Sequence, residues 1–539
     1  MSGSITLENR FGVNKMELIS LKYAIFVIVL LVLYYCFPKK YRWYVLLAGS
    51  MAYYVIICKW YVFFIIFTIC TTYGSTIWID KLLKKQNAIV KSHKEDWDRQ
   101  TRKEYKEKGR KKRVAVMLFA LLCNFGILAF LKYIPYAGEL GLLLPLGISF
   151  YTFQSMGYVM DVYREIVEPE KNFLKVALFV SFFPQIIQGP IAIYDKLAGQ
   201  LYEGHSLRLE NLQKGALLVL WGVMKKLVIA DRAVNIINLV MDKPMDFSGT
   251  YVFFAAVVYA LQLYADFSGG IDIVRGIAEM FGITMSTNFN HPYFSRSLTE
   301  YWHRWHMTLG DWCRNYIFYP LSISKRFLNF GKWLKPRFGA HISKVLPGCI
   351  ASVITFIVIG VWHGANMKYL YFGLWNGIVI MLAELFAPVN KKVSGGFFKL
   401  TGLREKGIFA TIVSVLWTFM LILVGYYFDI AANASTAFHM LFKSVTDFHI
   451  SELGINNIIL NLGACGLDEY DILLLIICTL LWFFISFVEE NKKLDMRDFI
   501  LSRKLPLRWA IIYLGIFIVI IFGYYGPGVN PADFVYMQF

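Results

Sequence analysis

Charged residues are scarce in this 539-residue chain, and so are the patterns that mark most soluble proteins. Only 17% of the residues are Asp, Glu, Lys or Arg, whereas soluble domains carry about 25%. Hydrophobic residues make up 57%. This composition leaves too little polar surface for several water-soluble domains, and it excludes intrinsic disorder, a collagen-like chain and a disulfide scaffold. We therefore expect a membrane protein.

The eight cysteines form no CxxC pair and no other metal-ligand spacing. Most of them lie in apolar runs, where a thiol usually packs as a small hydrophobic group. We expect no metal site and no redox function from them.

Apolar runs recur along the whole chain. A helix needs about 20 mainly apolar residues to cross a hydrocarbon layer about 30 Å thick. Runs near this length predict an all-α polytopic membrane protein with about 11 to 13 transmembrane or re-entrant helices. No small-residue cleavage site follows the first run, so it is expected to stay in the protein rather than to be removed as a signal peptide. The runs are residues 23–37, 43–58, 60–79, 114–130, 142–160, 173–187, 215–229, 251–264, 345–361, 369–386, 408–427, 472–488 and 509–525.

Residues 81–113 carry 14 Lys and Arg against five Asp and Glu, a net charge of +9 in a chain whose total is +18. The positive-inside rule predicts that this segment faces the cytoplasm. It is either a solvated helical anchor or a surface that attracts anionic lipid or an acidic cytosolic partner. No nucleic-acid recognition motif accompanies the charge, so no nucleic-acid binding is expected. We expect one membrane domain over residues 1–539, with N-terminal spans at 1–80, the basic cytoplasmic loop at 81–113 and the remaining core at 114–539.

A histidine, His363, lies inside the strongly apolar stretch of residues 354–377. An ionisable group at that depth is costly and normally faces the protein interior or a water-filled cavity. Imidazole has an unperturbed pKa of about 6.5, so it can accept a proton near neutral pH. His363 is therefore predicted to act as a general base. The structural alternative is a neutral histidine bonded to a backbone carbonyl.

A second polar cluster occupies residues 301–321, where histidines and charged residues stand among three tryptophans and three tyrosines. A spacing of three predicts that His303 and His306 share one helix face, and Gly310 would leave room beside the His306 ring. The segment is too charged to face lipid, so a helix that lines a binding site fits it best. An HxxH metal site lacks a third ligand, and an aromatic belt at the membrane interface is the structural alternative.

Two further segments interrupt apolar runs. Residues 264–276 carry Asp266 and Ser268 just before a Gly-Gly pair, which is expected to break or bend the helix. Residues 182–191 carry Gln185 between two prolines. Both segments are interpreted as walls of a cavity, with a purely structural kink as the alternative.

Seven strings follow one another from about residue 144 to the end of the chain: LPLGISFYTFQSMGYVMDVYR, FFPQIIQGPI, KKLVIADR, YADFSGGIDI, NFNHPYFSRSLTEYWHRWHMTL, GVWHGA and FVYMQF. In this order they resemble the membrane-bound O-acyltransferase family. The resemblance is strongest to its bacterial branch, which includes the membrane subunit of alginate O-acetylation. His303, Gly310 and Asn315 differ from the residues usual in alginate-type members, and these departures concern the identity of the acceptor.

The resemblance implies that His363 in GVWHGA is the essential buried histidine and that His306 is the second active-site histidine. It also implies a ring of helices around a central tunnel, where a cytoplasmic acyl donor meets an acceptor from the other side. No metal and no permanently bound cofactor are implied. The candidates for the tunnel or binding site are Trp305, Trp362, Arg304, Asp266, Ser268, Asn366 and Gln185.

The implied activity moves an acyl group, in the simplest case acetyl, toward hydroxyls of an extracellular polysaccharide or other cell-envelope polymer. The implied donor is acetyl-CoA or another thioester, including an acyl carrier protein. An extracytoplasmic partner with an acceptor serine and a location in the bacterial inner or plasma membrane are also implied. One alternative is D-alanyl transfer to teichoic acid from a carrier protein. Another is a transporter or flippase whose buried histidines carry protons, but no inverted repeat supports it.

Overall fold

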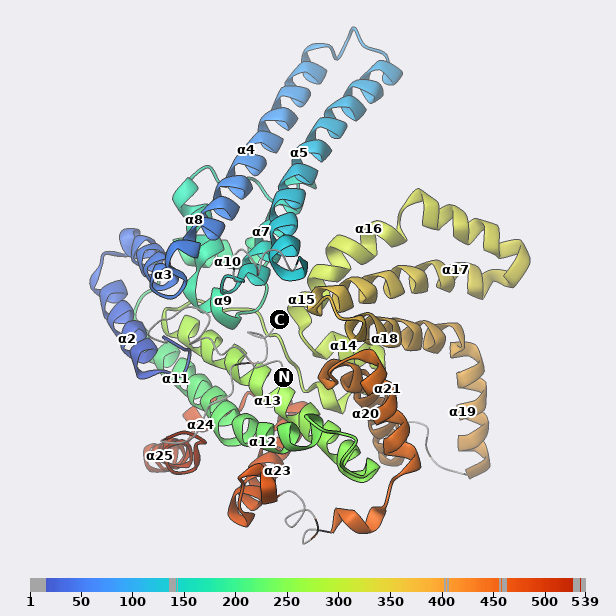
Figure 1. Cartoon of the computed structure of the whole chain (residues 1–539). Helices are drawn as coiled ribbons and strands as arrows, with labels where there is room; N and C mark the ends of the chain where they lie inside the picture. Colours follow the sequence, from blue (N-terminus) through green and yellow to red (C-terminus); the bar gives the residue numbers. More distant parts are fainter. Residues whose placement is uncertain are drawn as a thin grey trace. The chain divides into compact units, whose positions relative to one another are not determined.

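The computed structural model describes residues 16–134, 142, 144–401, 404, 407–454, 457, 463–526 and 534. Within these ranges every regular element is a helix and no strand occurs (Figure 1). The chain divides into two compact units, Met1–Val219 with Ile271–Ser286 and Leu220–Gly270 with Thr287–Phe539. The predicted all-α polytopic class is confirmed, and the protein is a multi-pass membrane protein.

Seven helices of the described residues are long and apolar enough to cross a membrane, or eight if a pair bent by 66° counts as one span. This number is lower than the predicted 11 to 13. Several predicted runs do form helices but are too short to qualify, such as Leu21–Cys36 and Phe173–Gln188. The seven helices are Lys39–Ser92, Arg99–Tyr133, Gly249–Met280, Lys325–His363, Ile408–Ile430, Glu469–Lys492 and Leu505–Phe522, and the bent pair is Met367–Leu385 with Ala387–Gly396. The predicted ring of helices and its tunnel stay predictions.

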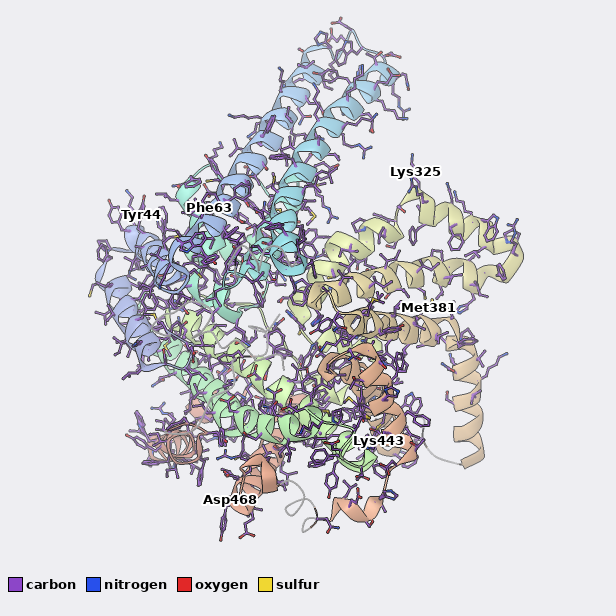
Figure 2. All side chains as sticks on the ribbon, viewed as in Figure 1. Tyr44, Phe63, Lys325, Met381, Lys443 and Asp468 are labelled. Carbon is purple, nitrogen blue, oxygen red and sulfur yellow. The ribbon has the colours of Figure 1, made fainter. Side chains whose placement is uncertain are left out.

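Large apolar side chains are exposed along these helices, as expected where lipid replaces water as the solvent. Phe63, labelled in Figure 2, has 63% of its surface exposed. Trp417 and Leu480 are exposed to a similar degree. On a soluble monomer such apolar surface would mark an interface, whereas here it fits the hydrocarbon layer.

The first unit is built from short and long helices of the N-terminal half. Its helices are α2 (Leu21–Cys36), α3 (Arg42–Cys58), α4 (Val62–Ser92), α5 (Arg99–Tyr133), α7 (Ile148–Tyr163), α8 (Phe173–Ser181), α9 (Phe183–Gln188) and α10 (Tyr194–Tyr202), with parts of α11 (Leu209–Met224) and α13 (Gly249–Met280). The predicted break near Pro184 is confirmed, because α8 ends at Ser181 and α9 begins at Phe183.

Helices α4 and α5 form a hairpin in which the two helices run side by side (Figure 1). Most of the basic segment 81–113 is therefore helical, and only the short connection between the helices is not. The buried Arg113 Nη1 donates to Gln86 Oε1 at 2.9 Å and ties the two helices together. Most of the other Lys and Arg side chains of this segment are exposed.

The second unit contains the rest of α11 and α13, the π-helix η3 (Lys225–Ala230) and all later elements. These include α12 (Asp231–Met241), η4 (Pro292–Phe294), α14 (Leu298–Arg304), α15 (Met307–Cys313), η5 (Arg314–Phe318), α16 (Tyr319–Ser322), α17 (Lys325–His363), α18 (Met367–Leu385), α19 (Ala387–Thr401), α20 (Ile408–Ile430), α21 (Ala434–Thr446), η6 (Ile450–Leu453), η7 (Gly463–Cys465), α23 (Glu469–Lys492), α24 (Met496–Leu501) and α25 (Leu505–Phe522).

The prediction that the Gly-Gly pair breaks its helix is wrong, because α13 runs continuously from Gly249 to Met280. The pair serves close packing instead. A Cβ atom added at Gly269 would lie 2.8 Å from the carbonyl oxygen of Gly222 on α11. A larger residue at this position would push the two helices apart, so the glycine is required by helix–helix contact rather than by a bend.

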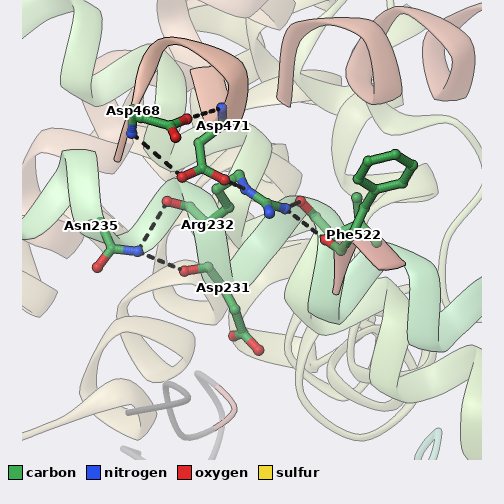
Figure 3. Close-up of polar contacts among 7 residues, drawn as sticks. Asp231, Arg232, Asn235, Asp468, Asp471 and Phe522 are labelled. Carbon is green, nitrogen blue, oxygen red and sulfur yellow. Dashed lines mark hydrogen bonds and ion pairs between the residues drawn. The ribbon is translucent and has the colours of Figure 1, made fainter. Parts of the chain in front are cut away.

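Two buried basic residues of the second unit, Lys226 and Arg232, form ionic contacts with carboxylates. Lys226 on η3 is buried, and its Nζ lies 2.6 Å from Asp266 Oδ1 and 2.8 Å from Asp231 Oδ1. Arg232 joins three helices (Figure 3). Its Nε donates to Asp471 Oδ1 at 2.8 Å and its Nη1 donates to the Phe522 carbonyl at 3.0 Å. Buried charges require such partners, since the desolvation cost is large.

Replacing Lys226 by Met should destabilise the protein strongly, because Asp231 and Asp266 would lose the ammonium group between them. Breaking a buried ion pair from one side typically costs about 3–5 kcal/mol. The matched control is Lys84→Met, which removes the exposed partner of Asp80 and should cost at most about 1 kcal/mol. Thermal unfolding of both variants in detergent, followed by size-exclusion chromatography, measures the difference. Equal melting temperatures would contradict the role of the buried cluster.

The positive-inside rule places the turn between α4 and α5 in the cytoplasm. A cysteine introduced by Glu95→Cys in this exposed turn should react with a membrane-impermeant maleimide in inside-out vesicles but not in intact cells. The unmodified chain gives the background from its own cysteines. Labelling in intact cells would reverse the predicted topology.

Candidate active site

His306 lies between two helices rather than within one. Helix α14 ends at Arg304, α15 begins at Met307, and His306 adopts a left-handed conformation with φ 43° and ψ 52°. The prediction that His303 and His306 share a helix face is therefore wrong. His303 is exposed, whereas only 5% of the His306 surface is exposed. The helical pattern of the sequence could not reveal the break, because no proline or glycine marks it.

His363 is the last residue of α17, and the chain leaves the helix at Gly364 before α18 begins. The two helices approach each other closely, since a Cβ atom at Gly360 would lie only 2.2 Å from the carbonyl oxygen of Tyr369. The His363 ring lies 5.9 Å from the Tyr369 ring and 5.4 Å from the Phe372 ring, measured between centroids. The end of α17 thus holds the imidazole in an aromatic environment, where His363 is half-buried rather than buried as the resemblance implied.

Trp362 connects the two histidines in the second unit, because its ring lies 5.0 Å from that of His363 and also faces His306. The His306 ring lies 6.4 Å from the ring of Trp362 and 4.9 Å from that of Phe267, with an edge-on orientation to Phe267. Burial, with a further contribution from the charge of His363, holds the pKa of His306 well below its ordinary value. His306 is therefore neutral at pH 7, and the two imidazoles interact electrostatically.

Asn288 is the functional candidate that the sequence analysis missed. Its side chain is 1% exposed, and its Oδ1 atom lies 3.1 Å from His306 Nδ1. A polar residue is conspicuous in the sequence when it lies in an apolar run. Asn288 lies instead in the irregular segment between α13 and α14. The available signal was its place at the start of the string NFNHPYF.

Asp266 and Ser268 are engaged with lysines. Asp266 accepts from Lys226 at 2.6 Å, and Ser268 Oγ accepts from Lys225 Nζ at 2.9 Å. Both side chains are buried. These contacts link α13 to the π-helix η3, and the place of Asp266 and Ser268 on a tunnel wall stays a prediction.

Arg304, Trp305 and Asn366 also make defined contacts. Arg304 Nη2 lies 2.7 Å from Glu300 Oε1 and 3.0 Å from Glu490 Oε1. Trp305 is buried in an aromatic cluster and stacks on Tyr301 at 5.7 Å. Asn366 caps α18, since its side chain accepts from the Lys368 N–H at 3.1 Å. A direct contact of these three residues with a substrate stays a prediction.

Gln185 belongs to the first unit. It is buried on α9, and its Nε2 donates to Gln154 Oε1. Gln154 in turn donates to the Phe179 carbonyl at 2.6 Å. This chain of hydrogen bonds satisfies two amides in an apolar interior, and a contact of Gln185 with a substrate stays a prediction.

Among the residues that the structure describes, no group of three His, Cys, Asp or Glu side chains could hold a metal ion. The eight cysteines are all free thiols. Cys58, Cys313, Cys349 and Cys478 are buried, as expected for packing residues.

Comparison with known proteins finds similarity to enzymes named as acetyl- or alanyltransferases of cell-envelope or secreted polymers. A family model of membrane-bound O-acyltransferases matches residues 169–335, which include His306. A probable alginate O-acetylase AlgI of Pseudomonas syringae pv. tomato is 30% identical over 313 residues, which cover 58% of this chain and 54% of the relative. A peptidoglycan O-acetyltransferase of Helicobacter pylori is 29% identical over 314 residues, 51% of this chain and 56% of the relative. A teichoic acid D-alanyltransferase of Bacillus subtilis is 26% identical over 287 residues, 52% of this chain and 67% of the relative.

The matched part of this chain thus spans about half the length of the first of these relatives. The relatives act on different polymers, but they share one reaction class. The ordered motifs, the helical fold and these similarities all agree with the resemblance seen in the sequence, and the family model of membrane-bound O-acyltransferases matches residues 169–335 of this chain.

Proposed function

We propose that this protein transfers an acyl group, in the simplest case acetyl, from a thioester to a hydroxyl of a cell-envelope polymer or of a partner protein that serves it. The observation that carries this proposal is that the rings of His306 and His363, which come from separate segments of the chain, both lie beside the ring of Trp362 in an aromatic environment. A neutral imidazole near the reacting groups is a suitable proton acceptor. The relatives named as O-acetylases support the acetyl group.

Acyl transfer requires a hydroxyl to become nucleophilic. The acceptor oxygen attacks the thioester carbonyl carbon and forms a C–O bond while its proton moves to an imidazole. The tetrahedral intermediate then breaks its C–S bond, and the leaving thiolate takes the proton. We assign the base to His363 and the orientation of the acceptor to His306. Exclusion of water by the aromatic side chains would protect the thioester from hydrolysis.

The donor, the partner and the membrane are inferred from chemistry and from the relatives. Acetyl-CoA or an acylated carrier protein would approach from the cytoplasm, where the basic hairpin of α4 and α5 attracts acidic molecules. The acceptor would be a serine of an extracytoplasmic partner that passes the acyl group to the polymer, and the membrane would be the bacterial plasma membrane. D-alanyl transfer to teichoic acid is the second candidate, because two D-alanyltransferases are among the relatives. The similarity to membrane-bound O-acyltransferases disfavours the transporter alternative.

Replacing His363 by Ala should lower the transfer rate by about 10²- to 10⁴-fold, the usual contribution of a general base. The assay uses membrane vesicles that carry the protein, radiolabelled acetyl-CoA and envelope polymer isolated from the host. His303→Ala is the matched control, since it removes an exposed imidazole and should leave the rate near that of the wild type. A His363→Ala protein that elutes normally from a sizing column and still transfers at the normal rate would remove the assignment.

Deleting the chain from its host should remove an ester from the envelope polymer. Mild alkaline hydrolysis of the isolated polymer releases the acyl group, and mass spectrometry identifies it as acetate or D-alanine. Loss of acetate supports the first candidate, and loss of D-alanine supports the second. Unchanged ester content, with the polymer present in normal amount, would contradict both.

A further inference from the structure

Asn288 clamps the segment that carries His306. The Asn288 carbonyl accepts from the Met307 N–H at 2.9 Å, and the Asn290 N–H donates to the Arg304 carbonyl at 3.0 Å. These two backbone bonds pair the irregular segment after α13 with the break between α14 and α15. They hold His306 in its left-handed conformation, which is unfavourable for a residue other than glycine.

The Asn288 side chain receives three hydrogen bonds at one atom. Oδ1 lies 3.1 Å from the backbone nitrogen of Thr308, 2.9 Å from Thr308 Oγ1 and 3.1 Å from His306 Nδ1. A backbone N–H can only donate, so the atom that faces it must be the amide oxygen rather than the amide nitrogen. The orientation of the amide is therefore determined by the main chain.

This orientation determines the tautomer of His306. Because Oδ1 can only accept, Nδ1 of His306 must carry the hydrogen. In a neutral imidazole the other nitrogen then holds the lone pair. That nitrogen, Nε2, is buried and has no hydrogen-bond partner among the described residues.

Charged groups on the neighbouring elements are engaged elsewhere. Arg304 on α14 pairs with Glu300 and Glu490, and Asp311 on α15 pairs with Arg314. Lys226 and Asp266, which face the region from η3 and α13, pair with each other, and Lys225 donates to Ser268. His363 at the end of α17 is the titratable group whose charge acts on His306. No carboxylate contributes to that interaction, so none favours the protonated imidazole.

We propose that Asn288 is a positioning residue for acyl transfer, which keeps the proton of His306 on Nδ1 so that Nε2 presents a lone pair to the reactants. The inference rests on the proposed function and makes it more specific. A lone-pair nitrogen accepts hydrogen bonds, so His306 holds an O–H or N–H group of the acceptor. It does not polarise the thioester carbonyl, because that role needs a donor.

The substitution Asn288→Asp tests this role. A carboxylate oxygen can still accept from Thr308 and His306, so the clamp is kept. Its negative charge, however, favours the protonated imidazole and raises the pKa of His306, typically by 1–3 units for an adjacent opposite charge. Below the new pKa, Nε2 is protonated and its lone pair is lost. The acid limb of the pH profile of kcat/KM should therefore become steeper, because a second imidazole is now protonated, with about tenfold lower activity one unit below the new pKa, and activity should recover by neutral pH.

Thr308→Val is the matched control. It removes one of the three hydrogen bonds to the same Asn288 oxygen and introduces no charge. Its thermal stability should fall, and its pH profile should keep the position of the wild type. The same acetyl-CoA vesicle assay measures all three proteins.

An Asn288→Asp profile that coincides with that of the wild type, or a loss of activity that is equal at every pH, would overturn the proposal.

A second measurement does not depend on activity or on the variant. Nitrogen-15 NMR of histidine-labelled wild-type protein, assigned with His306→Gln, reports which ring nitrogen carries hydrogen. Protonated Nδ1 and bare Nε2 at neutral pH are expected, and a hydrogen on Nε2 would refute the tautomer. Absence of any acyl transfer by the wild type would instead refute the proposed function.

Discussion

Hydrocarbon offers no hydrogen-bond partners, so polar groups on apolar helices must find their partners inside the protein. This constraint accounts for the principal contacts of the second unit. Lys226 lies between two carboxylates, and Arg232 reaches both a carboxylate on α23 and a backbone carbonyl at the end of α25. The contacts with Asp266, Asp471 and Phe522 join segments that are far apart in the sequence. The same contacts therefore satisfy the buried polar groups and hold the helices together.

In the candidate active site, the polar groups at the ends of helices must also find hydrogen-bond partners inside the protein. His363 ends α17, and His306 stands between α14 and α15. Non-helical backbone leaves peptide groups that need partners, and at His306 the main chain and side chain of Asn288 supply them. These hydrogen bonds also orient an imidazole and select its tautomer. A helix break exposes unpaired peptide groups and would be costly in a simple membrane span. Here the break between α14 and α15 places the His306 imidazole, a proton acceptor, in a defined geometry.

Much of the fold could be predicted because long hydrophobic runs in the sequence indicate membrane helices. Each of the 13 predicted runs falls at least partly on a helix, although several helices are too short to count as full spans. His363 could be singled out because an ionisable group is conspicuous in apolar surroundings, whereas the role of His306 follows from the family resemblance, and both roles stay predictions. The predicted break at the Gly-Gly pair is wrong, because a glycine that permits close packing, such as Gly269, and a glycine that ends a helix look the same in sequence. His303 and His306 were placed on one face because local spacing contains no sign of the break between them.

Composition and the order of nearby residues were enough to predict a helical chain that crosses the membrane several times, because apolar runs follow directly from the local sequence, and the proton-transfer role of the two histidines stays a prediction. Only the tertiary structure decided which histidine is buried, which glycines are contact points and that Asn288 belongs to the site. Those properties depend on hydrogen bonds and contacts between residues distant in the chain, such as the bond from His306 Nδ1 to Asn288 Oδ1. Such partners are brought together by helix packing, and no local pattern specifies them.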